Sequence, residues 1–165
     1  FIGNQADPDF WDDFKLKVKS IDVLLDDGGH TYPQQIITSE SMLDIINDGG
    51  MLVVEDTHTS YADGYGKKEI NFIQYTKLWI DKINSRFSGF GKKQSDTRVW
   101  SVEIYESIVA FNVNKKASEI ISKPIWNKTP NENEKDFRNF GTKEDKNNKD
   151  KINTIFKKAF SFYND

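Results

Sequence analysis

The sequence contains no cysteine, which excludes a disulfide framework and any metal site built on thiolates. It has no apolar run near the roughly 18 residues that a membrane-spanning helix requires. Its net charge is only −3, with lysines and acids interspersed, so it lacks the basic stripe of proteins that follow a nucleic-acid backbone. These absences predict a cytoplasmic protein that binds neither nucleic acid nor a membrane.

The chain has 165 residues, enough for one domain with its own hydrophobic core followed by a tail. It opens on FIGNQ, which resembles the end of a strand, and no initiator Met or signal peptide precedes this segment. We therefore expect an N-terminal truncation. From Pro8, apolar residues near helical spacing predict a short helix, with Asp7 or Asp9 as its N-cap.

Two short apolar runs each end in a pair of acids. The first, IDVLLDD at 21–27, is too short for a helix and predicts a strand buried on both faces. Residues 33–47 place most apolar side chains on one helical face, and Gly49-Gly50 is expected to end that helix. The second run, MLVVEDT at 51–57, predicts another buried strand. Strand, helix and strand form a right-handed βαβ unit, so both acid pairs are expected at one edge of a parallel sheet.

The remaining segments predict a helix, a closing pair of strands and a tail. The helix is expected over about residues 69–87, and the strands over 99–105 and 108–113. Beyond residue 116 the chain turns polar, which predicts a tail over 117–165 that is largely disordered across 127–150. Its terminal run KINTIFKKAFSFY is compatible with a short amphipathic helix. The side chains expected to pack in the core are Phe72, Ile73, Leu78, Trp79, Ile80, Ile83 and Trp100.

The acid pairs predict a site for a divalent cation. Ligands of open α/β sheets bind beyond the carboxyl ends of the strands, and neighbouring strands lie about 4.8 Å apart. Asp27, Glu55 and Asp56 are therefore expected to converge above the sheet edge. Carboxylates so close repel one another unless a cation holds them ionised. Oxygen ligands without sulfur favour Mg²⁺, Mn²⁺ or Ca²⁺ over zinc.

Each acid pair is followed closely by a histidine. His30 lies in the turn after Asp27, and an imidazole is suited to accept a proton near neutral pH, so we interpret it as the candidate general base. His58 is the competing candidate, and either histidine could instead be a metal ligand or a surface residue. A single acid pair at a strand end is more often a helix cap or a solvated turn. Two pairs on adjacent strands favour a functional site.

Four segments carry a family resemblance: FIGNQADPDF, IDVLLDDGGH, GGMLVVEDTHTSY and VWSVEIYESIVAF. Together they resemble the class I S-adenosylmethionine-dependent methyltransferases, and most closely the metal-dependent macrolide-sugar O-methyltransferases of the mycinamicin and macrocin type. The similarity covers roughly residues 1–113. It implies a Rossmann-like α/β sheet, mostly parallel with an antiparallel closing strand, and makes residues 1–116 the C-terminal part of such a domain.

The resemblance also implies roles for individual residues. It implies that Mg²⁺, or Mn²⁺, is bound by Asp27, Glu55 and Asp56, and that His30 is the base. The family's adenine turn corresponds to Gly3-Asn4-Gln5, where an amide replaces a carboxylate, and Asp26 is expected on the cofactor side. The glycine-rich loop and the ribose-binding acid of the family would precede Phe1. The implied reaction transfers a methyl group to a hydroxyl of a sugar or another vicinal diol, and homo-oligomerisation stays open.

Two other functions compete with this interpretation. Acid clusters at strand ends also serve two-metal hydrolases and phosphoryl-transfer enzymes, although the sequence has no P-loop and only one compact acid cluster. Alternatively, the chain is a non-catalytic domain that retains a truncated methyltransferase fold.

Overall fold

The computed structural model describes residues 1–86, 96–120 and 149–160. The chain divides into two compact units, Phe1–Pro124 and Ile125–Asp165, and each is described by itself. The elements of the first unit are α1 (Pro8–Lys17), β1 (Ile21–Asp26), α2 (Tyr32–Met42), β2 (Ile46–Val54), the 3₁₀ helices η1 (Thr57–Tyr61) and η2 (Lys68–Ile70), α3 (Phe72–Asn84), β3 (Ser101–Tyr105), β4 (Ile108–Asn112) and α4 (Lys115–Ser118). The second unit contains α6 (Lys149–Ala159).

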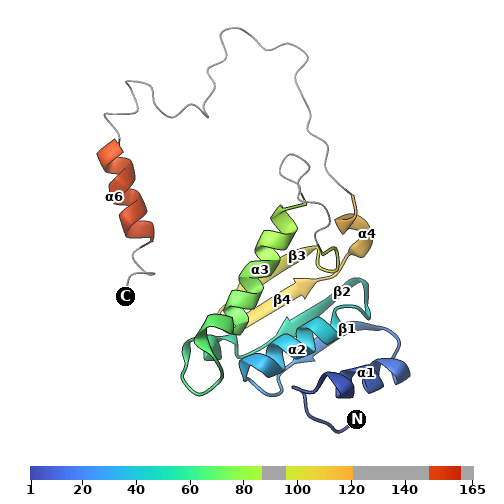
Figure 1. Ribbon diagram of the computed structural model, residues 1–165. Coiled ribbons are helices and arrows are strands. Elements are labelled where there is room, and N and C mark those ends of the chain that lie inside the picture. The colour runs from blue at the N-terminus through green and yellow to red at the C-terminus, as the bar shows by residue number, and fades with distance from the viewer. Residues whose placement is uncertain (87–95, 121–148, 161–165) are drawn as a thin grey trace, which may run out of the picture. The chain divides into compact units, whose positions relative to one another are not determined.

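The strands of the first unit form one mixed sheet in the order β1-β2-β4-β3 (Figure 1). β1 pairs with β2 in parallel, whereas β4 is antiparallel to both β2 and β3. Both the predicted βαβ unit and the predicted closing strand pair are therefore confirmed. Because β1 and β2 run in the same direction, the residues that follow Asp26 and Val54 leave the sheet at the same edge.

The boundary between α2 and β2 differs from the prediction. The helix ends at Met42, and Gly49 and Gly50 lie inside β2 instead of ending the helix. A Cβ atom on Gly50 would lie 2.2 Å from the carbonyl oxygen of Asp22, so this glycine allows β1 and β2 to approach. The two glycines also exchange backbone hydrogen bonds with Val113. Both glycines are thus strand residues, and Gly50 lets the backbone of β1 pack closely against β2.

β1 is not buried on both faces, contrary to the prediction. Val23 and Leu25 are 61% and 59% exposed, whereas Leu24 packs against the core. Strand side chains alternate between the two faces of a sheet, and α2 and α3 cover only one of them (Figure 1). No helix or strand of the described residues therefore covers the β1 side chains that face away from these helices, and they are exposed to solvent.

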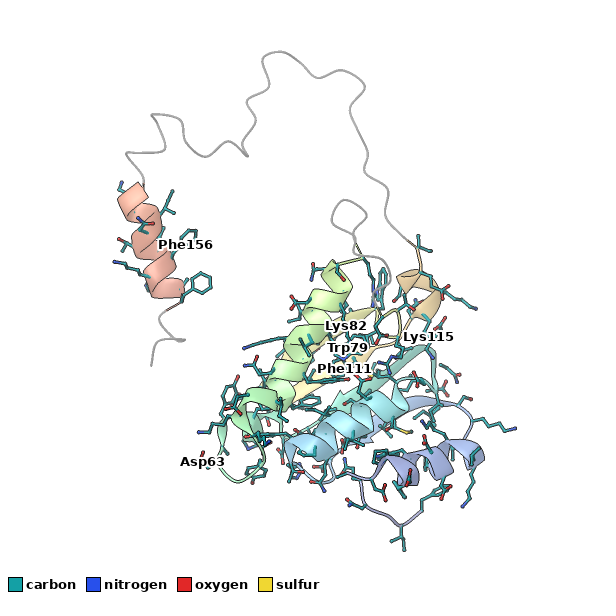
Figure 2. All side chains as sticks on the ribbon, in the orientation of Figure 1. Asp63, Trp79, Lys82, Phe111, Lys115 and Phe156 are labelled. Atoms are coloured by element: carbon teal, nitrogen blue, oxygen red, sulfur yellow. The ribbon has the colours of Figure 1, made fainter. Side chains whose placement is uncertain are left out.

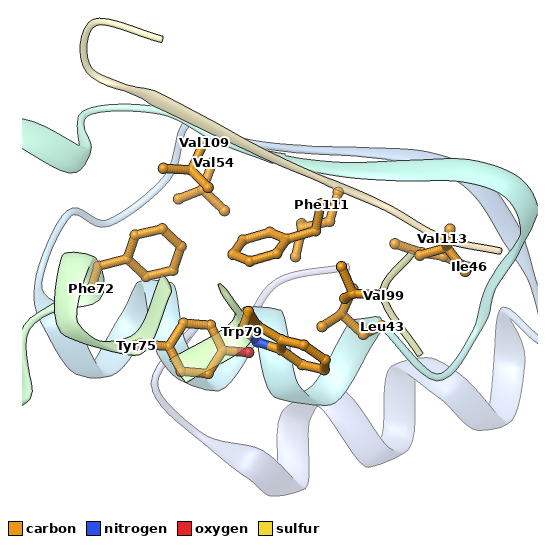
Figure 3. Close-up of a cluster of buried hydrophobic side chains, with 11 residues drawn as sticks. Leu43, Ile46, Val54, Phe72, Tyr75, Trp79, Val99, Val109, Phe111 and Val113 are labelled. Carbon is orange, nitrogen blue, oxygen red and sulfur yellow. The ribbon is translucent and has the colours of Figure 1, made fainter. Parts of the chain in front are cut away.

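The core lies between this covered face and α3 (Figure 3). Phe72 and Trp79 of α3 are fully buried against Phe111 of β4, at ring-centroid distances of 6.1 and 6.3 Å. Such aromatic side chains contribute strongly to the stability of a core because each removes a large apolar area from water. Three predicted core residues are instead exposed at the surface: Leu78 (57%), Ile80 (41%) and Trp100 (48%). Tyr75 takes a place in the core because it shares the helical face of Phe72 and Trp79.

A cluster of charged side chains covers the outer side of Trp79. Arg98 Nη2 lies 2.6 Å from both Glu40 Oε2 and Asp96 Oδ2. The Arg98 guanidinium lies 5.4 Å from the centroid of the Trp79 indole. The ammonium of Lys82, which is labelled beside Trp79 in Figure 2, lies 4.0 Å from the same centroid. Burial by itself would raise the pKa of Asp96, but the hydrogen bonds from Arg98 outweigh burial and hold the pKa at about 2. This network ties α2 to the segment before β3.

α6 occupies the place where the sequence predicts a terminal amphipathic helix. Most of the predicted disordered stretch, residues 127–148, lies outside the described residues. No helix in the described parts of the chain is long and apolar enough to cross a membrane.

Candidate metal and cofactor site

Two acidic residues and a histidine come together at the shared edge of β1 and β2. Asp27, His30 and Asp56 each offer one potential ligand atom, and these atoms all lie within 4.8 Å of one another. His30 Nε2 lies 3.4 Å from Asp56 Oδ2. The side chains of His30 and Asp56 are 30% and 43% exposed, so the cluster is open to solvent. The carboxylate oxygens of Asp27 and Asp56 suit a divalent cation of the Mg²⁺ or Mn²⁺ type, whereas an imidazole nitrogen is a ligand that Mg²⁺ rarely takes.

Glu55 is not part of this cluster of three, although the sequence predicts it as a ligand. Its backbone is bound on both sides: its N–H donates to the Asp26 carbonyl at 3.0 Å, and its carbonyl accepts from Gln35 Nε2 at 3.0 Å. The role of the Glu55 carboxylate as a third ligand therefore stays a prediction.

The loop that carries Asp56 has an unusual backbone conformation. Asp56 is in the left-handed region, with φ 54° and ψ 33°, which is sparsely populated by residues other than glycine. Thr59 stabilises this turn, because its hydroxyl lies 2.9 Å from the Asp56 carbonyl and 3.1 Å from the His30 carbonyl. The buried Thr59 thus connects the two loops that supply the cluster. Sequence reasoning missed Thr59, and its only signal is its place in the EDTHTSY segment.

The hairpin turn between β3 and β4 supports the same loop from the other side. The carbonyl of Ser107 accepts a hydrogen bond from the N–H of Thr57 at 3.1 Å. The Ser107 hydroxyl lies 2.6 Å from Nδ1 of His58. That nitrogen is 3.7 Å from Asp56 Oδ1, and the His58 side chain is 64% exposed. His58 therefore borders the cluster, whereas His30 lies within it.

Of the predicted cofactor residues, Gln5 is bound to the turn after β1. Its Nε2 donates to Asp26 Oδ1 at 2.6 Å, and its Oε1 accepts from the N–H of Gly29 at 2.7 Å. Asn4 is exposed, and its side-chain oxygen accepts from the N–H of Ala6 at 3.0 Å. Gln5 thus orients the DDGG turn, and Asn4 shapes the loop before it.

An open cavity of about 370 Å³ lies beside this turn. Gln5, Trp11 and Asp26 are among its lining residues, as is Thr38 of α2. Asp26 is only 7% exposed, and burial raises the pKa of its carboxyl group despite the hydrogen bonds from Gln5 and Gly28. Asp26 Oδ2 and Thr38 Oγ1 are buried without a hydrogen-bond partner among the described residues. Buried polar atoms are nearly always paired, so these two atoms fit a bound molecule that carries amino or hydroxyl groups.

No protein-family model matches the chain, but curated relatives do. Demethylmacrocin O-methyltransferase of Streptomyces fradiae is 22% identical over an alignment of 117 residues, and the match covers 65% of this chain and 30% of that enzyme. L-olivosyl-oleandolide 3-O-methyltransferase of Streptomyces antibioticus is 37% identical over 62 residues, which are 38% of this chain and 16% of that enzyme. The chain thus spans less than a third of the length of these relatives.

Solved structures match over more of the chain. The MycE methyltransferase from the mycinamycin biosynthetic pathway, in complex with Mg and SAH, superposes with a TM-score of 0.67 at 19% identity. The match covers 76% of this chain and 35% of MycE. The chain has a methyltransferase fold. The Rossmann-like α/β class implied by the resemblance is confirmed, as is the similarity to macrolide and sugar O-methyltransferases.

Proposed function

We propose that this chain carries the metal and methyl-acceptor side of an S-adenosylmethionine-dependent O-methyltransferase that acts on a sugar or another vicinal diol. The observation that carries this proposal is the cluster of Asp27, His30 and Asp56 at the sheet edge where β1 ends in the buried Asp26 and β2 ends at Val54. The cluster can hold a cation and a proton acceptor, and the adjoining cavity offers unpaired acceptors for a polar cofactor.

The similar proteins support this choice of reaction. The curated relatives are named as O-methyltransferases, one of them for L-olivosyl-oleandolide, and MycE has been solved with Mg and SAH and also with Mg, SAH and Mycinamycin VI. A metal-dependent hydrolase and a non-catalytic domain gain no support from these comparisons. A cytoplasmic location stays a prediction.

The residues of the cluster would have two roles, metal binding and proton acceptance. Asp27 and Asp56 would hold Mg²⁺ or Mn²⁺, with Glu55 as a predicted third ligand. When bound, the cation lowers the pKa of a hydroxyl that it contacts. His30 would accept the hydroxyl proton at Nε2, and the carboxylate of Asp56, 3.4 Å away, would stabilise the imidazolium that results.

The cofactor side depends on Asp26 and Gln5. Asp26 Oδ2 would accept a hydrogen bond from an amino or hydroxyl group of S-adenosylmethionine, which supplies the methyl group. Gln5 fixes the Asp26 carboxylate through the other oxygen, at 2.6 Å. A carboxylate held in one orientation positions the cofactor relative to the acceptor, and such orientation is a large source of rate.

Calorimetric titration of Mn²⁺ into the chain tests the metal site. We expect binding of one ion per chain, and a loss of affinity of at least tenfold in Asp27→Asn and in Asp56→Asn. Asp63→Asn is the matched control, because the Asp63 side chain is 90% exposed and forms an ion pair with Lys68, at 2.8 Å, outside the cluster. Unchanged affinity in both cluster variants contradicts the proposal.

A further inference from the structure

Over residues 151–160, one face of α6 is apolar. Its residues follow the spacing i, i+3, i+4, i+7 and i+8, which places them on a single helical stripe. Three of them, Ile155, Phe156 and Phe160, are 63%, 57% and 58% exposed. Phe156 projects away from the helix axis in Figure 2, and its ring packs edge-on against Phe160 at 6.5 Å. The apolar stripe consists of Ile152, Ile155, Phe156, Ala159 and Phe160.

The rest of α6 is basic. Residues 149–160 contain four lysines and one aspartate, a net charge of +3, whereas the whole chain has a net charge of −3. At about 100° per residue, Lys151 and Lys158 fall along one border of the apolar stripe, and Lys157 falls beyond the other. Over residues 151–160, which contain three lysines and no acidic residue, the helix thus combines a hydrophobic face with a cationic margin on both sides.

This pattern does not fit pairing between copies of the helix. Coiled coils require apolar heptads over at least three to four repeats, and α6 has only 11 residues. Its apolar stripe is also about 140° wide, broader than the narrow seam that two paired helices share. In addition, a helix this short is marginally stable by itself in water, so a surface that binds its apolar face would stabilise it.

We propose that α6 lies in the interface of an anionic phospholipid membrane, although the composition of the whole chain predicts no membrane binding. The apolar stripe would enter the boundary between head groups and acyl chains, and the flanking lysines would extend their ammonium groups to the lipid phosphates. The net charge of +3 supplies the complementarity that a negatively charged surface selects. This mode of binding differs from a membrane span, for which α6 is too short and too polar. It brings the methyltransferase fold to the membrane surface reversibly.

Sedimentation with lipid vesicles tests this inference on the full chain. We expect binding to vesicles of phosphatidylcholine with phosphatidylglycerol, little binding to pure phosphatidylcholine, and release as the salt concentration rises. The variant Lys157→Gln/Lys158→Gln should bind roughly tenfold or more weakly. The variant Ile155→Asp/Phe156→Asp should lose binding. Leu16→Asp is the control, because Leu16 is a 76% exposed apolar residue on α1, outside α6.

Three outcomes overturn the proposal. The first is equal binding to neutral and anionic vesicles, and the second is an Ile155→Asp/Phe156→Asp variant that binds like the parent chain. The third is a chain that binds neither vesicle type, whether it stays monomeric or self-associates through α6 in sedimentation equilibrium. Thermal unfolding of each variant verifies that the first unit is intact, so loss of binding is assigned to α6.

Discussion

His30 and Asp56 come from loops after two different strands, yet His30 Nε2 lies 3.4 Å from Asp56 Oδ2. The two residues therefore act as neighbours in any chemistry at this edge of the sheet. A histidine so placed can be a base beside a metal-binding carboxylate or a ligand of the same cation, and these roles make different predictions.

If His30 is the base, His30→Ala should lower the kcat of methyl transfer by roughly 10²-fold, the usual contribution of a positioned acid–base group. Its Mn²⁺ affinity should stay within about twofold of the parent chain. Titration calorimetry measures the Mn²⁺ affinity. The transfer of labelled methyl groups to a panel of glycosides measures kcat. A large loss of Mn²⁺ affinity would make His30 a ligand instead.

His58→Ala serves as the comparison for that experiment. His58 contacts Ser107 and lies outside the cluster of three, so its removal should change kcat far less than removal of His30. The reverse ranking of the two variants would transfer the role of base to His58.

Thr59→Val should weaken Mn²⁺ binding although Thr59 contributes no ligand atom. The substitution removes the hydroxyl that lies 2.9 Å from the Asp56 carbonyl and 3.1 Å from the His30 carbonyl, and it destabilises the fold by about 1 kcal/mol. Thr59→Ser retains this hydroxyl and should restore metal affinity. Equal affinities for both variants in titration calorimetry would show that Thr59 has no positioning role.

Asp96→Asn should destabilise the protein at neutral pH by roughly 2 kcal/mol, because the folded pKa of Asp96 is about 2 and its ordinary value is 3.8. The pKa is lowered on folding, so the stabilisation is fully present above the ordinary value and is lost as the pH falls toward about 2. Urea unfolding from pH 7 down to pH 2 measures the difference between parent and variant. A difference that does not shrink with acid contradicts the role assigned to the Arg98 network.

Gly50→Ala should destabilise the fold by about 3 kcal/mol or more, because the new Cβ would lie 2.2 Å from the Asp22 carbonyl and the strands would have to separate. Gly64→Ala is the control. Its φ of +89° makes alanine unfavourable by about 1 kcal/mol, but no atom lies within 4 Å of the new Cβ. Thermal unfolding of the two variants should therefore separate steric overlap from backbone strain.

The sequence predicts the βαβ unit well because the acid pairs and the apolar runs mark where β1 and β2 end. It misplaces the end of α2 because the apolar residues at 43–46 continue a helical pattern, while in the fold Leu43 and Ile46 enter the core from a turn and from β2. The sequence predicts that Gly50 ends the helix because a glycine often follows a helical pattern. In the fold Gly50 lies against β1 instead, and the local sequence does not encode that contact.

The candidate site is predicted in position but not in detail. Strand ends indicate which residues reach the sheet edge, and Asp27 and Asp56 do so together. The direction of a side chain depends on backbone torsions, and the left-handed conformation of Asp56 breaks the regular alternation at this point. For this reason His30, and not Glu55, completes the group of three that the structure brings together.

The open side of β1 has a consequence for amide exchange. Among the described residues β1 pairs with β2 along one side only, and Val23 and Leu25 are largely exposed. Every second amide group of this strand points toward β2 and is hydrogen-bonded to it, so its proton should exchange slowly when the protein is placed in deuterium oxide. The protons of the amide groups between them should exchange quickly. β2, which is paired on both sides, should show no such alternation, so a residue-resolved exchange profile will distinguish the edge of the sheet from its centre.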